Sequence, residues 1–543
     1  MSTPASAARP PALSPEVLSS EESATPRPAL PSHVEHLVIG AGFGGLGAVI
    51  GLHEDGEDDV LVVEKAPDLG GTWRANTYPG AACDVPSQLY SFSFAPNPDW
   101  SMSFSPQPEI QAYLQRVAAS SGLLHRFSFD TEVLDATWLE DQQRWQVTTS
   151  RGVVLARYLI SCAGGLSEPR LPEIEGLESF RGELFHSADW DHSADLRGKR
   201  VAVIGTGASA IQIIPQLQPV VGHLDVYQRT APWVIPRNDR RYTRAEKFAF
   251  RHVPGVMKAY RTGIYWGREL YVPAFAWQPR LAAPARRAAE LNIRLGIKDP
   301  ALREAVTPTF AIGCKRILIS NTYYPALAAD NTELVTDAIT AITPTGIVTG
   351  GGTSSGTGSG TGTERAVDAI VVATGFHVTD HPVAQRITGR HGESLAQAWS
   401  RTGQRAYKGT TVPGFPNFFM VVGPNTTLGH SSMVFVIESQ LAYLRRAVAA
   451  ARVNGYATME PREDATDEWN ADLQRRMGRT VWNSGGCASW YLDEHGRNTT
   501  VWPRNTFTLR RLLAAFDPAA YELGPARPVQ AGPEIPETLE VGA

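Results

Sequence analysis

The chain has 543 residues, too many for one hydrophobic core, so two or three domains are expected. Hydrophobic residues make up 43% and charged residues 19%, as in a globular protein, and the net charge of −5 argues against nucleic acid or an anionic membrane as a partner. The four cysteines (Cys83, Cys162, Cys314 and Cys487) form no CxxC pair, which argues against a metal finger or a dithiol redox centre and is consistent with a reducing cytosol.

Both ends of the chain are polar. Residues 1–32 are rich in Pro, Ala and Ser and lack the apolar segment of a signal peptide, and residues 528–543 are similarly polar. We expect two disordered tails. No apolar run reaches the roughly 18 residues of a membrane-spanning helix, so we expect a cytoplasmic protein without a membrane segment.

The segment HLVIGAGFGGLGAVIGLHEDGEDDVLVVEK, from residue 36 on, predicts a buried strand, a glycine-rich turn, a helix and a second strand. Gly40 permits the tight turn, Gly42 lets the backbone approach a pyrophosphate, and Gly45 allows the helix to pack closely on the strand. Glu64 ends the second strand and can accept hydrogen bonds from a ribose. This pattern predicts a dinucleotide-binding unit that suits FAD.

A second unit begins at GKRVAVIGTGASAIQIIPQL, with Gly205, Gly207 and Ala210 at the same offsets. Its second strand, HLDVYQRT, ends with Arg229 and Thr230 instead of an acid. An acid would repel the 2′-phosphate of NADPH, whereas arginine offers it a charged, forked donor. The unit therefore suits NADPH, and the alternative for Arg229 is a solvated charge at the end of a strand.

The remaining pattern predicts how the two units are connected. Helical periodicity between residues 238 and 308 indicates a helical insertion, the low-complexity stretch 349–363 a hairpin tip, and AVDAIVVATGF and FPNFFMVVG buried strands. We predict an α/β fold of two Rossmann-like domains. The FAD domain spans residues 33–165 and 391–527, and the NADPH domain spans residues 166–390.

Two further motifs resemble those of one flavoenzyme family. The first is F-x-G-x-x-x-H-x-x-x-W-D, matched by Phe180, Gly182, His186, Trp190 and Asp191. The second is G-G-x-W-x4-Y-P-G-x3-D, matched by Gly70, Gly71, Trp73, Tyr78, Pro79, Gly80 and Asp84. Over residues 34–525 the chain resembles the type I Baeyer–Villiger monooxygenases, which are FAD- and NADPH-dependent class B flavoprotein monooxygenases.

The resemblance implies an enzyme that converts ketones to esters or lactones with O2 and NADPH, through a peroxide at C4a of the flavin. A small ketone and O2 are then the expected partners, and the protein is expected to be a monomer or a weak homo-oligomer. Two alternatives are a flavin monooxygenase that oxidises sulfur or nitrogen centres and a non-oxygenating NADPH-dependent flavin reductase. The missing CxxC pair argues against the reductase.

Oxygen transfer to a ketone needs a fixed cation beside developing negative charge in a pocket that excludes water. The segment GCKRILISNTYYPAL resembles the family's catalytic-arginine segment, which implies Arg316 over the flavin and Lys315 facing the NADPH phosphate. Asp84 would position Arg316. The alternative is a solvated Lys-Arg pair at the surface.

Two further residues are catalytic candidates by the same resemblance. His186 is expected to act as a conformational and hydrogen-bonding residue in a linker beside the NADPH unit, with an ordinary loop histidine as the alternative. Trp502 is expected to contact the nicotinamide ribose and the substrate, with a core tryptophan as the alternative.

The motifs also imply cofactor contacts. Those for FAD are Gly40, Gly42, Gly45, Glu64, Thr72, Trp73, Asp84, Tyr90 and Val133. Those for NADPH are Thr206, Gly207, Ser209, Ala210, Gln212, Arg229, Thr230, Lys315 and Arg316. No metal site is expected. The chain departs from the family at Ala82, where arginine is frequent, and in the turn GPNTTLGH, which leaves the substrate range open.

Overall fold

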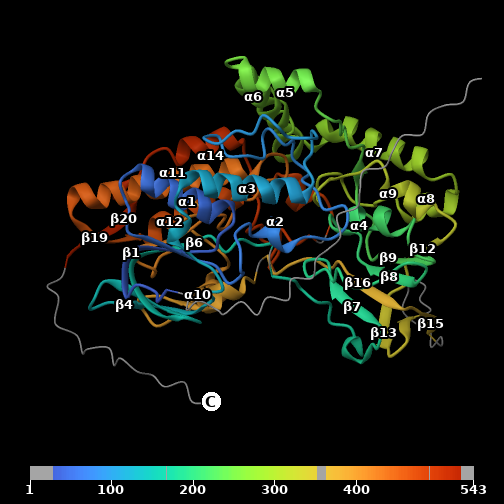
Figure 1. Ribbon diagram of the computed structural model, residues 1–543, viewed down its shortest axis with the longest axis horizontal. Helices are drawn as coiled ribbons and strands as arrows, with labels where there is room; N and C mark the ends of the chain where they lie inside the picture. Colours follow the sequence, from blue (N-terminus) through green and yellow to red (C-terminus); the bar gives the residue numbers. More distant parts are fainter. Residues whose placement is uncertain are drawn as a thin grey trace, which may run out of the picture.

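The computed structural model describes residues 28–526 apart from 167, 351–361, 379, 488 and 494. The predicted tails and hairpin tip therefore lie mostly outside the described residues. Figure 1 shows two units side by side, with the first and last parts of the chain together in one unit and the middle part in the other. Leu30 already packs on the first unit, and the first strand begins at His33.

The first unit contains an eight-stranded sheet in the order β17-β4-β5-β6-β1-β2-β3, with β18 also paired to β6. β1 pairs in parallel with β2 and β6, whereas β4, β5 and β6 form an antiparallel meander. The strands are β1 (His33–Ile39), β2 (Val60–Val63), β3 (Phe127–Ser128), β4 (Val133–Leu139), β5 (Arg144–Thr149), β6 (Gly152–Ser161), β17 (Ile387–Thr388) and β18 (Phe418–Met420).

Helices cover one face of this sheet. One of them, α1, is almost completely buried between the sheet and the other helices. The covering helices are α1 (Phe43–Glu54), α2 (Thr72–Ala75), α3 (Gln107–Ser121) and α11 (Met433–Asn454). α1 and α11 lie together in Figure 1, and glycine lets them approach, since a Cβ on Gly47 would come within 2.8 Å of the Leu441 side chain. A second core, which contains Trp145, packs α10 (Leu395–Thr402) together with side chains of β1 and of the meander strands.

The second unit is a parallel sheet in the order β12-β9-β8-β16-β7. Its strands are β7 (Glu183–His186), β8 (Arg200–Ile204), β9 (His223–Tyr227), β12 (Thr332–Val335) and β16 (Ala369–Val372). α4 (Ala210–Leu217) and α9 (Tyr323–Leu327) contact each other beside it, and β13 (Ile339–Thr343), β14 (Gly346–Thr349) and β15 (Thr363–Ala366) form a small antiparallel sheet. Both units thus have the predicted α/β architecture.

Four helices lie between β9 and β11 in the sequence and run along one edge of the molecule (Figure 1). They are α5 (Arg244–His252), α6 (Val256–Glu269), α7 (Ala283–Gly296) and α8 (Pro300–Ala305), flanked by β10 (Val234–Ile235) and β11 (Leu318–Ile319). α6 reaches the first unit, where Arg261 donates to the backbone oxygen of Ser91 at 3.0 Å and Tyr265 stacks on Phe435.

The C-terminal part returns to the first unit. Its elements are β19 (Tyr456–Pro461), α12 (Glu463–Met477), α13 (Val481–Ser484), α14 (Thr506–Leu512) and β20 (Tyr521–Pro525). β19 and β20 pair with each other, and α14 contacts α11. Among the described helices, none is long and apolar enough to cross a membrane.

Candidate active site

The first glycine turn has no room for side chains. Gly40 has a φ of +97°, and a Cβ on Gly45 would lie 1.9 Å from the Gly40 carbonyl oxygen. Glu64 braces the turn, since its two carboxylate oxygens accept hydrogen bonds from the backbone N–H of Ala41 at 2.8 Å and of Ala66 at 2.9 Å. The geometry at these predicted residues is that of a dinucleotide-binding turn.

A second backbone turn faces the start of α1. A Cβ on Gly71 would lie 3.0 Å from the Gly42 Cα, and neither α1 nor α2 has a side-chain cap at its N-terminus. The backbone N–H groups of a helix start attract a pyrophosphate, and the missing side chains let it approach. These residues therefore fit FAD.

Two predicted flavin contacts touch one another beyond this cradle. Trp73 Nε1 lies 3.1 Å from the hydroxyl oxygen of Tyr90, and the two rings meet edge to face. Burial raises the pKa of Tyr90 above its ordinary range, so the phenol is neutral. Thr72 begins α2, and Val133 is buried at the start of β4. The cradle therefore continues into a wall formed by buried Trp73 and partly buried Tyr90.

The second glycine turn is open on one side. Gly205 has a φ of +115°, and a Cβ there would lie 2.5 Å from the Ala373 carbonyl oxygen, whereas a Cβ on Gly207 would meet nothing within 4 Å. Thr206 donates its hydroxyl to the Thr230 carbonyl oxygen at 3.2 Å, and α4 starts at Ala210 after Ser209 without a side-chain cap. The turn fits the pyrophosphate of a second dinucleotide.

Two cations of the second unit interact with each other. Arg229 is exposed at the end of β9, and Lys315 is half-buried with its Nζ 5.3 Å from the ring centre of Phe310. Burial and the charge of Arg229 lower the pKa of Lys315. Two cations that repel each other favour an anion between them, and the 2′-phosphate of NADPH is such an anion.

Asp84 and Arg316 form the predicted ion pair. Arg316 Nη2 lies 3.2 Å from Asp84 Oδ2, and 39% of the Arg316 side chain remains exposed. Burial opposes the charge on Arg316, but Asp84, with smaller contributions from Tyr491 and Cys83, raises the pKa of the guanidinium. Arg268 of α6 donates to the Asp84 backbone oxygen at 2.9 Å, a contact that no sequence motif signals.

Gln212 joins this pair to the second unit. Its side-chain Nε2 donates to the Ala82 carbonyl oxygen at 3.1 Å and lies 3.4 Å from Asp84 Oδ1. Its Oε1 accepts from the hydroxyl of Tyr78 at 3.0 Å. A Cβ on Gly80 would lie 2.6 Å from the Gln212 carbonyl oxygen, so the Y-P-G motif packs directly on α4. The sequence predicts only an NADPH contact for Gln212 and misses this bridging position.

His186 ends β7, so the predicted linker begins as an edge strand of the second sheet. The ring is 4% exposed, its Nδ1 accepts from the Ala188 N–H at 3.0 Å, and its Nε2 has no hydrogen-bond partner among the described residues. Burial lowers the pKa of His186. The ring lies edge-on to Phe376, in the segment that returns the chain to the first unit, and its catalytic role stays a prediction.

Trp502 lies in the core of the first unit. It is 1% exposed, stacks on Trp469, and donates its indole N–H to the Asn505 carbonyl oxygen at 3.0 Å. Its backbone N–H donates to the Thr427 carbonyl oxygen at 2.9 Å, which ties it to the turn GPNTTLGH. The geometry favours a core tryptophan, and contact with the nicotinamide ribose stays a prediction.

The cysteine spacing misleads at one point. Cys314 and Cys487 form a disulfide across 173 residues, and only Cys83 and Cys162 are free thiols. The absence of a CxxC pair therefore does not exclude a cysteine pair, because the fold brings distant segments together. Disulfides are rare in a reducing cytosol, so the cysteines no longer support that compartment.

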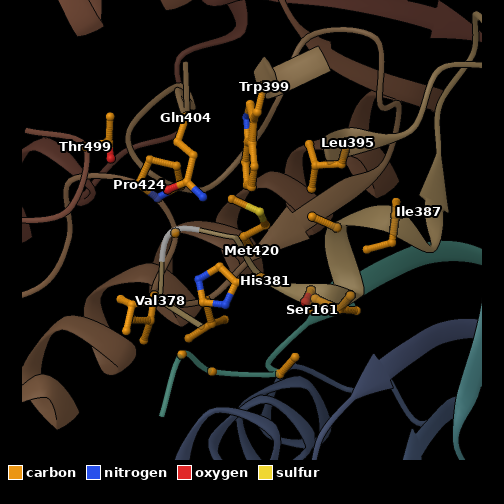
Figure 2. A pocket seen from close by; sticks show the side chains of 18 of the residues that line it. Ser161, Val378, His381, Ile387, Leu395, Trp399, Gln404, Met420, Pro424 and Thr499 are labelled. Atoms are coloured by element: carbon orange, nitrogen blue, oxygen red, sulfur yellow. The ribbon is translucent and has the colours of Figure 1, made fainter. Parts of the chain in front are cut away.

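A separate pocket lies in the first unit beside α10 and β18 (Figure 2). His381, Trp399 and Met420 line it, together with both segments through which the chain passes between the units. Trp399 donates its indole N–H to the Arg405 carbonyl oxygen, and burial lowers the pKa of His381. No predicted site residue lines this pocket, so the candidate active site is the junction around Asp84 and Arg316.

Known proteins match this chain over nearly its full length. The model of the flavin-binding monooxygenase-like family matches residues 34–252. A Baeyer–Villiger monooxygenase of Streptomyces coelicolor is 49% identical, over 93% of this chain and 95% of the relative, and one of Pseudomonas aeruginosa is 46% identical, over 92% and 93%.

Solved structures agree with these relatives. A cyclohexanone monooxygenase from Rhodococcus sp. Phi1 bound to NADP+ superimposes with a TM-score of 0.80 at 30% identity, covering 92% of this chain and all of that chain. An oxidised steroid monooxygenase bound to NADP has a TM-score of 0.78 at 32% identity, covering 91% and 100%. The chain belongs to the Baeyer–Villiger monooxygenases.

Proposed function

We propose that the protein is an FAD- and NADPH-dependent monooxygenase that converts ketones to esters or lactones with O2. The observation that carries this proposal is the Asp84–Arg316 pair, held where the two dinucleotide-binding units meet. The family relationship supports ketone oxygenation over oxidation of sulfur or nitrogen. NADPH is preferred over NADH because Arg229 and Lys315 are placed for its 2′-phosphate.

Bound FAD supplies the redox chemistry, in which NADPH provides the electrons and O2 the inserted oxygen atom. Arg316 supplies a permanent positive charge beside the oxygen atom of the ketone, which becomes negative in the transition state. A guanidinium suits this task because it does not lose its proton near neutral pH, and Asp84 raises its pKa further.

Asp84 and its partners orient Arg316. Asp84 is 14% exposed and contacts groups from three directions: Arg316, Gln212 of α4 and Arg268 of α6. A carboxylate held this way accepts the guanidinium in one geometry and needs little rearrangement during the reaction. Movement of the second unit relative to the first would therefore shift Asp84 and change the position of the Arg316 guanidinium.

We place the enzyme in the cytoplasm, where NADPH is supplied, as a monomer or weak homo-oligomer. The proposal on activity is tested by incubating FAD-loaded protein with NADPH and cyclic, linear and aryl ketones under air. We expect oxygen uptake equal to NADPH consumed and a product 16 mass units heavier, with 18O2 supplying the added atom. Oxidation of sulfides or amines alone, with every ketone returned unchanged, would contradict it.

A further inference from the structure

The disulfide between Cys314 and Cys487 lies beside the proposed catalytic arginine. Cys314 stands two residues before Arg316, and Cys487 belongs to a loop of described residues between 485 and 498 that follows α13. The Cα atoms of the two cysteines are 6.2 Å apart. The bond thus fastens the C-terminal loop to the segment that carries Arg316.

The two segments also touch through their backbones. Ala311 donates its N–H to the Gly485 carbonyl oxygen at 3.0 Å, and within the turn Cys314 donates its N–H to the Ala311 carbonyl oxygen at 3.1 Å. A Cβ on Gly485 would lie 2.6 Å from the Cys314 Cβ. The turn 311–314 is therefore pressed against the end of α13, and a shift of one segment moves the other.

The loop carries a buried side chain back to Arg316. Tyr491 is 3% exposed, and its phenol and the Arg316 guanidinium interact electrostatically. Burial raises the pKa of Tyr491 to about 12, so the phenol is neutral at physiological pH. A neutral buried phenol near the guanidinium adds no second charge to the Asp84–Arg316 pair.

Beyond Tyr491 the loop is anchored in the first unit. Leu492 bridges to Asn498, and the Asn425 side chain donates to the Asn498 carbonyl oxygen at 2.8 Å. The loop therefore runs from the disulfide, past Arg316, to the turn that holds Asn425. It is fixed at its far end by buried hydrogen bonds and at its near end by the disulfide.

Arg316 has few constraints of its own. Asp84 is its one ion-pair partner among the described residues, and 39% of the side chain is exposed. Part of the loop is exposed to solvent, since Trp490 is 44% exposed. Without the covalent bond, one backbone hydrogen bond among the described residues, from the Ala311 N–H to the Gly485 carbonyl oxygen, still joins the near end of the loop to the turn 311–314.

We propose that the Cys314–Cys487 disulfide positions Arg316, and that its reduction separates NADPH oxidation from oxygen transfer to the ketone. This inference rests on the proposed function. The cysteines are positioning residues: they act by fastening the loop that carries Tyr491 to the turn 311–314, which leads directly into Arg316.

Reduction by a dithiol accounts for all atoms and electrons. A dithiol thiolate attacks Cys487, which is partly exposed, and Cys314, which is 1% exposed, leaves as a thiolate. The second dithiol sulfur closes a cyclic disulfide and releases Cys487. Two electrons and two protons pass from the dithiol to the cysteines, so the protein gains two thiols.

The expected effect separates two half-reactions. The dinucleotide turns at Gly40 and Gly205 lie outside 311–317 and 485–498, so FAD content and flavin reduction at saturating NADPH should stay near the oxidised values, while the Michaelis constant for NADPH rises because Lys315 follows Cys314. Displacement of a catalytic group by about 1 Å can cost up to about a hundredfold in rate, so the ratio of ester to hydrogen peroxide should fall about ten- to a hundredfold. A general loss of fold would lower both half-reactions together.

Thiol counting tests the bond itself. Denatured without reductant, the FAD-loaded enzyme should titrate two thiols, and after dithiothreitol it should titrate four. Four thiols in the untreated protein would overturn the proposal. Four thiols after anaerobic NADPH alone would also overturn it, because the pair would then be an electron acceptor and not a structural link.

Activity and hydrogen exchange test the role. Dithiothreitol-treated enzyme and Cys487→Ser should share the lowered ester-to-peroxide ratio, Cys487→Ser should not respond to dithiothreitol, and Cys162→Ser should still respond. An unchanged ratio, with ester still formed, would overturn the inference alone. Absence of ester from the oxidised enzyme would instead refute the proposed function.

Hydrogen exchange tests the inference independently of activity. Reduction must speed exchange in 311–317 and 485–498, and equal exchange in the oxidised and reduced enzyme would overturn the inference.

Discussion

Gln212 in the second unit and Asp84 in the first lie 3.4 Å apart, measured from the amide nitrogen to a carboxylate oxygen. The same amide holds Ala82, and its oxygen accepts from Tyr78. One side chain of α4 thus joins the NADPH turn to the carboxylate that orients Arg316. We expect nucleotide binding at the second unit to affect the position of Arg316 through this short chain of hydrogen bonds.

Replacing Gln212 tests this connection. Gln212→Ala removes a hydrogen bond to a charged group, which typically contributes about 1.5–3 kcal/mol, so ester formation should slow about tenfold or more. Hydrogen peroxide per NADPH should rise, because Asp84 loses a constraint. Steady-state rates with parallel peroxide assays measure both. A rise in the Michaelis constant for NADPH with no change in peroxide would assign Gln212 to cofactor binding alone.

Arg229 tests nucleotide choice. Arg229→Ala removes a charged donor for the 2′-phosphate, so the Michaelis constant for NADPH should rise about tenfold or more while that for NADH changes little. Arg197→Ala is the matched control, since Arg197 is an exposed arginine of the same unit paired with Asp195. Equal losses with both nucleotides would refute the assignment.

The two glycine turns predict opposite outcomes for alanine. Gly45→Ala places a Cβ 1.9 Å from a backbone oxygen, so it should abolish FAD retention or folding. Gly207→Ala places its Cβ in open space, so the protein should fold and retain FAD, but the methyl group obstructs the approach of NADPH. Flavin absorbance and the Michaelis constant for NADPH distinguish the two. An unaltered constant in Gly207→Ala would remove this turn from the NADPH site.

His186 predicts a pH dependence. Burial lowers its pKa below the ordinary value of 6.5, so the unfolded chain binds a proton that the folded chain does not. Stability should therefore fall as pH decreases below about 6.5, and less steeply in His186→Gln. Urea unfolding at pH 7 and pH 5.5 measures the difference. Identical pH slopes would place the titration elsewhere.

If His186 couples the units, His186→Ala should also keep FAD yet slow oxygenation and alter NADP retention.

Local signals predicted the fold and the positions of the two glycine turns. Gly40, Gly45 and Gly205 are required by backbone geometry within one strand-turn-helix segment, so their spacing is visible in the sequence. The Cys314–Cys487 bond and the Gln212–Asp84 contact join residues more than a hundred positions apart, and no periodic pattern marks them. Whether Trp502 faces substrate or core likewise depends on packing by other segments.

The proposed reaction depends on the positive charge of Arg316. Arg316→Ala should keep FAD and still be reduced by NADPH, because the dinucleotide turns lie elsewhere in the sequence. Loss of a fixed donor from the site should lower ester formation by on the order of 10²–10³ or more, and Arg316→Lys should restore little.

The most direct measurement is the yield of ester and of hydrogen peroxide per NADPH for the Arg316→Ala enzyme. We expect nearly all NADPH consumed by this variant to appear as hydrogen peroxide, with ester below detection. Ester yield equal to that of the unaltered enzyme would contradict it and would place the reaction away from the Asp84–Arg316 pair.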